Sequence, residues 1–336
     1  MRRPRNNIGK APIILITFPD YDTEHPQHGG ALTAAGYTMR IAEKRGARSP
    51  EGLLAFSAEA AGAIVSTDPF TRDVIRDSPH LQVIARVGVG IDSIDVGAAT
   101  ELGVAITTTP GANEETVADH TIAMMLGLLR RIPENDAGVR RGEWNRTGVH
   151  TPRQLAGCTV GLIGYGNIGR LVARRLAGFG VELLVSDPMI GQSDSPRSVE
   201  LAELLAQSDV VSLHTPLIPA TTNLIDRAAL QLMQPHAVLV NTSRGGVVDE
   251  AALIRALDEG VIAGAALDVF ETEPPIASPL LAMSNVVVSP HVAGISTTSL
   301  ELMMRRATAS VIDVIEGRIP EGLANRRILD EHPSAG

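Results

Sequence analysis

Short apolar runs alternate with segments of helical periodicity along most of this chain. In the first third of the chain the runs have the length of β-strands, and the segments between them space their apolar residues as a helix does. This alternation is typical of β-α-β units with a parallel sheet. Strands are predicted over residues 12–17, 62–66, 81–87 and 104–108, with helices that include residues 71–77 and 96–102.

A long helix and a second alternation follow. Apolar residues at helical spacing predict a helix over 114–131, and Thr109-Pro110-Gly111 interrupts the chain just before it. Residues 132–157 are rich in Gly, Arg, Asn and Thr and are expected to form a surface loop. The later strands are predicted over 159–163, 181–186, 210–214, 237–241, 262–266 and 286–289. The later helices are predicted over 167–179, 198–207, 249–259 and 297–316, with disorder from about residue 328.

Composition and charge narrow the class of protein. A chain of 336 residues has enough length for two hydrophobic cores. Its net charge of −9 argues against nucleic-acid binding, and no apolar run approaches the ~20 residues that cross a bilayer. The single cysteine, Cys158, excludes an intrachain disulfide and a cysteine metal cluster. We expect a cytoplasmic protein that binds no nucleic acid, no membrane and no metal ion.

A glycine-rich turn follows the first strand of the second alternation. Residues 164–169 read Gly-Tyr-Gly-Asn-Ile-Gly between an apolar strand and a helix, and Asp187 ends the next strand. In this context the glycines permit a tight turn and the close approach of a pyrophosphate, which the helix N-terminus binds. The carboxylate of Asp187 can accept hydrogen bonds from the adenosine ribose and would repel a 2′-phosphate. The pattern therefore predicts NAD in preference to NADP.

Charged and polar residues follow several later strands of the predicted sheet. In an open α/β sheet, ligands bind at the carboxyl ends of the strands. Removal of a hydride from a carbinol carbon requires a base for the hydroxyl proton, and a histidine held by a carboxylate suits that task near neutral pH. An arginine can bind a carboxylate in a fork and polarise a carbonyl. Arg244, Glu273 and His291 supply such a set.

With these motifs the chain resembles the D-isomer-specific 2-hydroxyacid dehydrogenases. The resemblance extends from about Leu81 to about Ala293. It rests on the glycine-rich turn with Asp187, Asn241-x-x-Arg244-Gly245, Asp268-Val269-Phe270 with Glu273-Pro274, and Pro290-His291. It implies an NAD-dependent enzyme that transfers a hydride between a D-2-hydroxy acid or 2-keto acid and nicotinamide. By this resemblance, Arg244 binds and polarises the substrate, His291 is the acid and base, and Glu273 holds the His291 side chain in place.

The resemblance also implies the remaining site residues. Those expected at the cofactor are Gly164, Gly166, Asn167, Ile168, Gly169, Asp187, His214, Thr215, Thr242, Ser243, Asp268 and Gly294. The backbone N–H groups of Val89 and Gly90 are expected to bind the substrate carboxylate. For His214 we favour contact with the nicotinamide over proton transfer. The other histidines are expected to have structural or surface roles, and they are His25, His28, His80, His120, His150, His236 and His332.

The implied architecture has two Rossmann-like domains, each a doubly wound parallel α/β sheet. An NAD-binding domain over 110–291 is inserted into a flavodoxin-like substrate domain over 1–109 and 292–336. The helix over 114–131 resembles the family's dimer-forming linker, so a homodimer is expected.

The sequence leaves the particular 2-hydroxy acid and the physiological direction open. Phosphoglycerate enzymes usually carry an arginine just after the strand that matches residues 62–65, whereas this chain has Asp68 there, a poor neighbour for a phosphate. Two other functions stay open: a dehydrogenase for a phosphite-type hydride donor, and an NAD(H)-sensing scaffold similar to the C-terminal-binding corepressors. The complete set of Arg244, Glu273 and His291 favours the enzyme.

Overall fold

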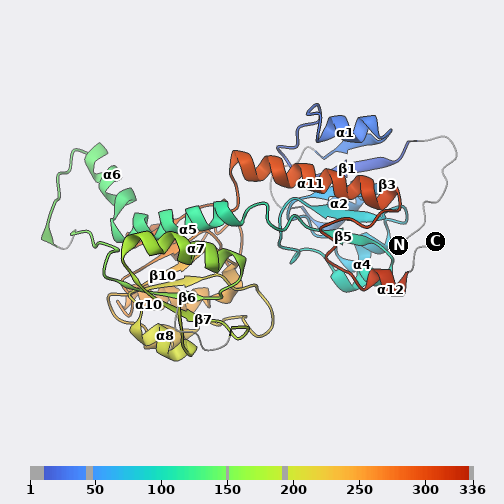
Figure 1. Ribbon diagram of the computed structural model, residues 1–336. Helices are drawn as coiled ribbons and strands as arrows, with labels where there is room; N and C mark the ends of the chain where they lie inside the picture. The colour runs from blue at the N-terminus through green and yellow to red at the C-terminus, as the bar shows by residue number, and fades with distance from the viewer. Residues whose placement is uncertain (1–10, 43–47, 149–150, 191–195, 333–336) are drawn as a thin grey trace. The chain divides into compact units, whose positions relative to one another are not determined.

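The chain folds into two compact units. The computed structural model describes residues 11–42, 48–148, 151–190 and 196–332 (Figure 1). The inserted unit comprises the residues from Glu114 to Ile295, and the split unit comprises the described residues before and after it. Both boundaries lie four residues beyond the expected positions, after 113 and after 295. The whole segment 289–294 therefore belongs to the inserted unit.

The split unit is a parallel sheet of five strands in the order β2-β1-β3-β4-β5. Its strands are β1 (Ile13–Ile16), β2 (Thr38–Ile41), β3 (Ala60–Val65), β4 (Val83–Arg86) and β5 (Ala105–Thr107). Its helices are α1 (Gly29–Ala34), α2 (Pro50–Ser57), α3 (Arg72–Arg76), α4 (Val96–Glu101), α11 (Thr297–Ile315) and α12 (Ile328–Glu331). Ile14 and Ile16 pack beneath α1 and α11, whereas Leu15 packs beneath α2, α3 and α4. The second part of the chain thus completes this unit with α11.

The inserted unit is a parallel sheet of seven strands in the order β12-β11-β10-β9-β6-β7-β8. Its strands are β6 (Thr159–Ile163), β7 (Glu182–Ser186), β8 (Arg197–Ser198), β9 (Val210–Leu213), β10 (Val238–Asn241), β11 (Gly264–Leu267) and β12 (Val286–Val288). Its α-helices are α5 (Glu114–Leu129), α6 (Ile132–Arg140), α7 (Asn167–Leu176), α8 (Leu201–Gln207), α9 (Arg227–Leu232) and α10 (Glu250–Asp258). Short 3-10 helices lie at Ala177–Phe179, Gly245–Val247 and Pro279–Ala282.

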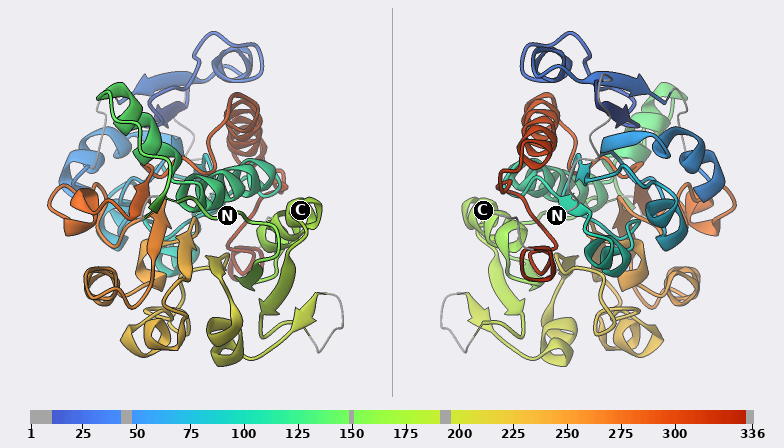
Figure 2. Two further views of the ribbon diagram at one scale, coloured as in Figure 1. Left: turned by 90° about the vertical axis from the view of Figure 1, so that its left-hand side faces the viewer. Right: turned by 90° about the vertical axis from the view of Figure 1, so that its right-hand side faces the viewer.

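Helices cover both faces of each sheet (Figure 1; Figure 2). In β10, Val238 and Val240 belong to the core under α5 and α7, and Leu239 belongs to the core under α8, α9 and α10. A strand that is buried on both faces needs apolar side chains at every position. That requirement explains the continuous apolar runs of the sequence and confirms the predicted fold class of two doubly wound parallel sheets.

Two predictions of irregular structure were wrong. Residues 132–140 form α6, although they were expected to be loop. This helix exposes Ile132 and Val139 and is supported by pairs such as Arg140 with Asp136, so it has no buried apolar stripe for the sequence pattern to reveal. The segment from about residue 328 was expected to be disordered, but Ile328–Glu331 form α12, because Ile328 is fully buried in the core beside α11. Residues 333–336 lie outside the described residues.

A buried ion pair anchors the loop after β3. Asp68 accepts hydrogen bonds from Arg48 Nε at 2.9 Å and from Thr17 Oγ1 at 2.5 Å. The side chains of Arg48 and Asp68 are only 3% and 8% exposed. The Arg48 guanidinium also donates to the Ala42 carbonyl and lies over the Phe56 ring. Both charges are therefore committed to the fold of the split unit.

We predict that Arg48→Met lowers the free energy of unfolding by about 3–5 kcal/mol, because it leaves Asp68 charged, buried and without its cation. Urea denaturation followed by circular dichroism would measure the loss. Adding Asp68→Asn should restore part of the stability, since the uncompensated charge is then removed.

The matched control for this prediction is Arg40→Met. Arg40 pairs with Glu59 at 2.6 Å, and 70% of the Glu59 side chain is exposed. Loss of such a surface pair costs under about 1 kcal/mol. Equal losses in the two variants would show that the buried pair does not stabilise the split unit.

Candidate active site

The predicted site residues of the inserted unit lie at one edge of its sheet. The glycine-rich turn of residues 164–169 follows β6, Asp187 follows β7, and His214 follows β9. The segments after β10, β11 and β12 carry the remaining predicted residues, which are Thr242, Ser243, Arg244, Asp268, Glu273, His291 and Gly294. Because all seven strands are parallel, these carboxyl ends meet at the same edge.

His291 and Glu273 form a direct pair at this edge. The Nδ1 atom of His291 lies 2.7 Å from Oε2 of Glu273, and Oε1 of Glu273 accepts the Phe270 N–H at 3.1 Å. With Nδ1 held in this way, the other ring nitrogen, Nε2, is the atom of His291 that can exchange a proton. The His291 side chain is 40% exposed, so a small molecule can reach it.

Several groups control the charge of Glu273. Burial is the largest single influence and opposes ionisation of this carboxyl. The hydrogen bond and charge of His291, the Phe270 N–H and the charge of Arg244 together outweigh burial, so the pKa of Glu273 lies below its ordinary value. The interaction with Arg244 also shows that the structure brings all three predicted residues into one electrostatic environment.

The backbone of His291 is in the left-handed region, with φ of 54°. A residue with a side chain adopts this conformation only where its surroundings hold it there. The Asp268 carboxylate accepts hydrogen bonds from the Val292 and Ala293 N–H groups at 2.9 and 2.8 Å, and the Asp268 carbonyl accepts the His291 N–H at 2.8 Å. Ser289 Oγ donates to the same carboxylate at 2.6 Å. Asp268, which is fully buried, therefore sets the conformation of the His291 segment.

Asn241 organises the segment that carries Arg244. Its Nδ2 donates to the Arg244 carbonyl at 2.9 Å, and its Oδ1 accepts the N–H and the hydroxyl of Ser243. The Arg244 guanidinium in turn donates to the Ser243 carbonyl at 2.7 Å. Asn241 was part of the recognised motif but was not predicted as a site residue. Asparagine side chains often form turns by hydrogen bonding to the nearby backbone, and this tendency could have identified Asn241 as a site residue.

The glycine-rich turn has the geometry that a dinucleotide requires. Gly164 has φ of 93°, and a Cβ there would lie 2.5 Å from the His214 carbonyl oxygen. A Cβ on Gly169 would lie 2.3 Å from the Gly164 carbonyl oxygen. A Cβ on Gly166 would meet nothing within 4 Å, and no side chain caps the N-terminus of α7. The uncapped start of this helix, with room beside Gly166, can therefore hold a phosphate.

Two further residues fit the same ligand. The Asp187 carboxylate accepts the Tyr165 N–H at 2.6 Å and the Met189 N–H at 2.8 Å, which leaves one lone pair on each oxygen for ribose hydroxyls. Burial lowers the pKa of His214 to about 4, and its Nε2 lies 3.0 Å from Ser212 Oγ. His214 is therefore neutral near pH 7, which favours contact with a cofactor over proton transfer.

The other predicted residues lie in the split unit. Val89 and Gly90 follow β4, and their backbone N–H groups have no hydrogen-bond partner among the described residues. The Arg86 guanidinium donates to the Val87 and Gly90 carbonyls and so holds this turn. Two adjacent N–H donors in such a turn can bind an anion. His150 lies outside the described residues.

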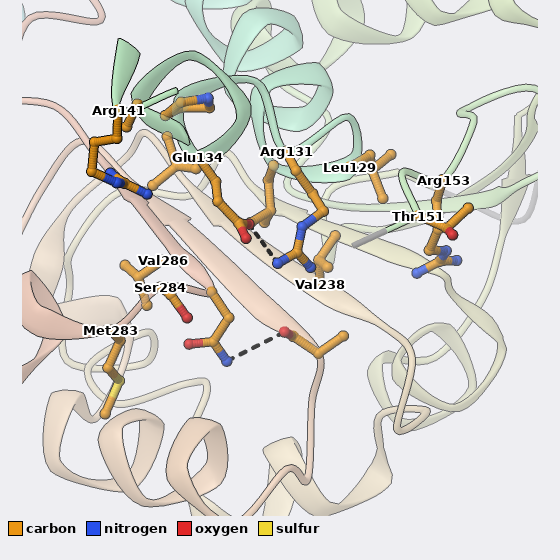
Figure 3. A pocket seen from close by; sticks show the side chains of 16 residues that line it. Leu129, Arg131, Glu134, Arg141, Thr151, Arg153, Val238, Met283, Ser284 and Val286 are labelled. Carbon is orange, nitrogen blue, oxygen red and sulfur yellow. Dashed lines mark hydrogen bonds and ion pairs between the residues drawn. The ribbon is translucent and has the colours of Figure 1, made fainter. Parts of the chain in front are cut away.

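One pocket of the inserted unit lies away from this edge. A pocket of ≈ 430 Å³ lies beside α6 (Figure 3), and Val238, Ala263 and Val286 line it at the amino ends of β10, β11 and β12. The Arg131–Glu134 ion pair is part of its lining. The carboxyl edge carries the candidate chemistry, so this pocket does not hold the reacting groups.

Two kinds of feature are absent from the described residues. No group of three or more His, Cys, Asp or Glu side chains is placed to hold a metal ion. No described helix combines the length and the apolar character that a membrane span needs.

Comparison with known proteins identifies the family. Residues 122–293 match the family model described as D-isomer specific 2-hydroxyacid dehydrogenase, NAD binding domain. This match covers half of the chain. The chain belongs to the D-isomer-specific 2-hydroxyacid dehydrogenase family. It is an NAD-dependent dehydrogenase that acts on CH–OH donors, and the inserted unit contains its NAD-binding domain.

Individual relatives agree with this assignment. The dehydrogenase is 38% identical to a glyoxylate reductase of Thermococcus litoralis over 334 residues, which cover 96% of this chain and 99% of the relative. It is 42% identical to a D-3-phosphoglycerate dehydrogenase of Methanocaldococcus jannaschii over 264 residues, but these cover 76% of this chain and only 49% of that relative. Its fold is similar to the TT0316 protein from Thermus thermophilus, with a TM-score of 0.85, 36% identity and coverage of 93% and 99%.

Proposed function

We propose that this dehydrogenase reduces a small unphosphorylated 2-keto acid of the glyoxylate class with NADH and oxidises the corresponding D-2-hydroxy acid in reverse. The observation that carries this proposal is the His291–Glu273 pair at 2.7 Å, at the same sheet edge as Arg244 and the glycine-rich turn. This edge joins a proton donor, a carboxylate-binding cation and a dinucleotide-binding turn. Reduction of a keto acid needs these three components.

Each residue has a distinct part in the proposed reaction. Nicotinamide supplies or receives the hydride when the cofactor is bound. In reduction, His291 Nε2 gives its proton to the carbonyl oxygen as C2 gains the hydride, and Glu273 stabilises the imidazolium before the transfer. The Arg244 guanidinium binds the substrate carboxylate and polarises the carbonyl. The N–H groups of Val89 and Gly90, in the split unit, are proposed as further donors to a substrate carboxylate.

The cofactor is proposed to lie along the carboxyl edge of the inserted unit. Asn167 and Ile168 lie at the N-terminus of α7 and, with the three glycines, would hold the pyrophosphate. Asp187 would bind the adenosine ribose. The residues proposed around the nicotinamide are His214, Thr215, Thr242, Ser243, Asp268 and Gly294.

Two observations support an unphosphorylated substrate. The relative from Thermococcus litoralis, which this chain matches over nearly its whole length, is named a glyoxylate reductase. In addition, the acidic residue after β3 is neutralised by Arg48, and only 3% of the Arg48 side chain is exposed. The Arg48 guanidinium is already paired with Asp68 and is not available to bind a phosphate.

A homodimer and a cytoplasmic location complete the proposal. The dimer is supported by apolar side chains on and after α6, where Ile132, Val139 and Trp144 are 55%, 55% and 75% exposed. Exposed apolar side chains that gather in one segment are typical of an interface. The cytoplasmic location is supported by the use of NAD and by a single cysteine.

The first prediction of this proposal concerns turnover. Purified protein should oxidise NADH with glyoxylate or hydroxypyruvate, and kcat/KM for phosphohydroxypyruvate should be lower by a factor of about ten or more. His291→Asn should lower kcat at least about 100-fold, because the proton donor is lost, and leave the Kd for NADH within about twofold. NADH absorbance and NADH fluorescence measure the two quantities.

The alternatives give different results in this assay. Turnover of NAD with phosphite, but of NADH with no keto acid, would identify the other type of hydride donor. Tight NADH binding without any turnover would indicate a sensor. Either result would overturn the proposed function.

A second prediction concerns pH. Glu273→Gln removes a carboxylate whose pKa lies below its ordinary value. In the wild-type protein the rate of keto-acid reduction should fall at low pH as this carboxylate takes up a proton, and this acid-side decline should be lost in the variant. The control is Glu271→Gln, which removes an exposed carboxylate two residues away. An equal effect of both substitutions on the profile would contradict the proposed role of the pair.

A third prediction concerns cofactor choice. Asp187→Ser should lower the ratio of kcat/KM for NADH over NADPH at least about tenfold, because the variant loses ribose contacts and no longer repels a 2′-phosphate. Glu182→Ser, at the amino end of β7, is the control and should leave the ratio unchanged. An unchanged ratio in Asp187→Ser would exclude the ribose role.

A further inference from the structure

Two consecutive residues of α5 contact the segments that carry His291 and Arg244. We propose that His120 and Thr121 are positioning residues, through which α5 sets the placement of these two side chains. The inference rests on the catalytic roles proposed above. The sequence predicts a structural or surface role for His120 and no site role for Thr121.

The contact of His120 leads to His291. His120 Nε2 lies 2.9 Å from Ser289 Oγ. Ser289 has a single hydroxyl proton, and the Asp268 carboxylate at 2.6 Å is a much stronger acceptor for it than the Met124 sulfur at 3.8 Å. Ser289 Oγ must then accept the proton of His120 Nε2. The hydrogen bonds run in one direction, from His120 through Ser289 to the carboxylate that holds the His291 segment.

The contact of Thr121 leads to Arg244. Thr121 Oγ1 donates to the Val117 carbonyl at 2.8 Å, within the helix. Its oxygen therefore accepts the hydroxyl proton of Thr242, whose Oγ1 is also 2.8 Å away. Thr121 is fully buried and Thr242 is 8% exposed, so water does not compete for this bond. Thr242 lies two residues before Arg244.

The order of the strands explains why one helix can reach both segments. β10, β11 and β12 are neighbours in the sheet. The segments after β10 and β12 are therefore separated only by the segment after β11, and one helix can span that distance. α5 itself is fixed on the unit, because Arg175 of α7 binds Glu115 and Asp119 at 2.6 Å each. The helix can thus act as a rigid support for both segments at once.

A positioning role and a purely structural role of His120 and Thr121 predict different kinetics for their variants. Reaction rates fall about 100-fold when a reacting group is displaced by about 1 Å, even where binding is preserved. Loss of the His120 contact should displace the proton donor, and loss of the Thr121 contact should displace the cation that binds the substrate. A purely structural role would instead change all kinetic parameters of both variants together with the melting temperature.

The experiment compares His120→Leu and Thr121→Val in the full-length protein with glyoxylate and NADH. We expect His120→Leu to lower kcat about tenfold or more with KM within about twofold, and Thr121→Val to raise KM about tenfold. His120→Gln keeps an N–H donor and Thr121→Ser keeps the hydroxyl, so both should recover most of the loss. Ala123→Ser is the control on the same helix, because Ala123 is exposed, and it should leave both parameters unchanged.

Other outcomes have separate meanings. If the wild-type protein turns over no keto acid, the proposed function fails before the variants are considered. If it is active and His120→Leu and Thr121→Val match it, the positioning role is refuted. The role is also refuted if both variants lose kcat, KM and melting temperature in parallel, or if Gln and Ser restore nothing. Melting curves by circular dichroism and NADH affinity by fluorescence provide the readouts that do not depend on turnover.

Discussion

The geometry of the candidate active site depends on one buried carboxylate. Asp268 has no exposed surface, and an isolated charge in that environment would cost many kcal/mol. Its two oxygens accept hydrogen bonds from Ser289, Val292 and Ala293, all of which lie in the segment after β12. These donors satisfy the buried carboxylate, so the end of β11 determines the path of the neighbouring segment. That path includes the left-handed backbone of His291.

A second buried carboxylate has a different role in the split unit. Asp68 and Arg48 neutralise each other inside the fold, and neither is offered to a ligand. In the inserted unit, the Glu273–His291 pair is partly exposed and the pKa of Glu273 is lowered, so its charge acts on a group that solvent and substrate can reach. Burial also keeps His214 neutral. Exposure and partners, more than residue type, thus separate the ionisable groups that support the fold from those that can react.

The parallel sheet brings together residues that are far apart along the chain. Asn241, Asp268 and Ser289 end or follow three adjacent strands, and backbone hydrogen bonds join Asp268 to Asn241 and to His291. Each strand therefore presents a short irregular segment to the same edge. The helices on the faces of the sheet then position these segments. α5 contacts two of the segments through neighbouring side chains.

The sequence by itself determined the features that depend on contiguous residues. The parallel fold class followed from apolar runs, because a strand buried on both faces leaves no choice of side chain. The glycine-rich turn and Asp187 were predictable because strand, turn and helix follow one another, while Arg244, Glu273 and His291 were predictable from motifs and from the family resemblance. Only the tertiary structure decided the partners of Asp68 and Asp268, the contact between His120 and Ser289, and the helix at 132–140. His120 and Ser289 are 169 positions apart. A hydrogen bond between side chains depends on where two segments meet in space, and a helix without a buried stripe leaves no periodic trace in the sequence.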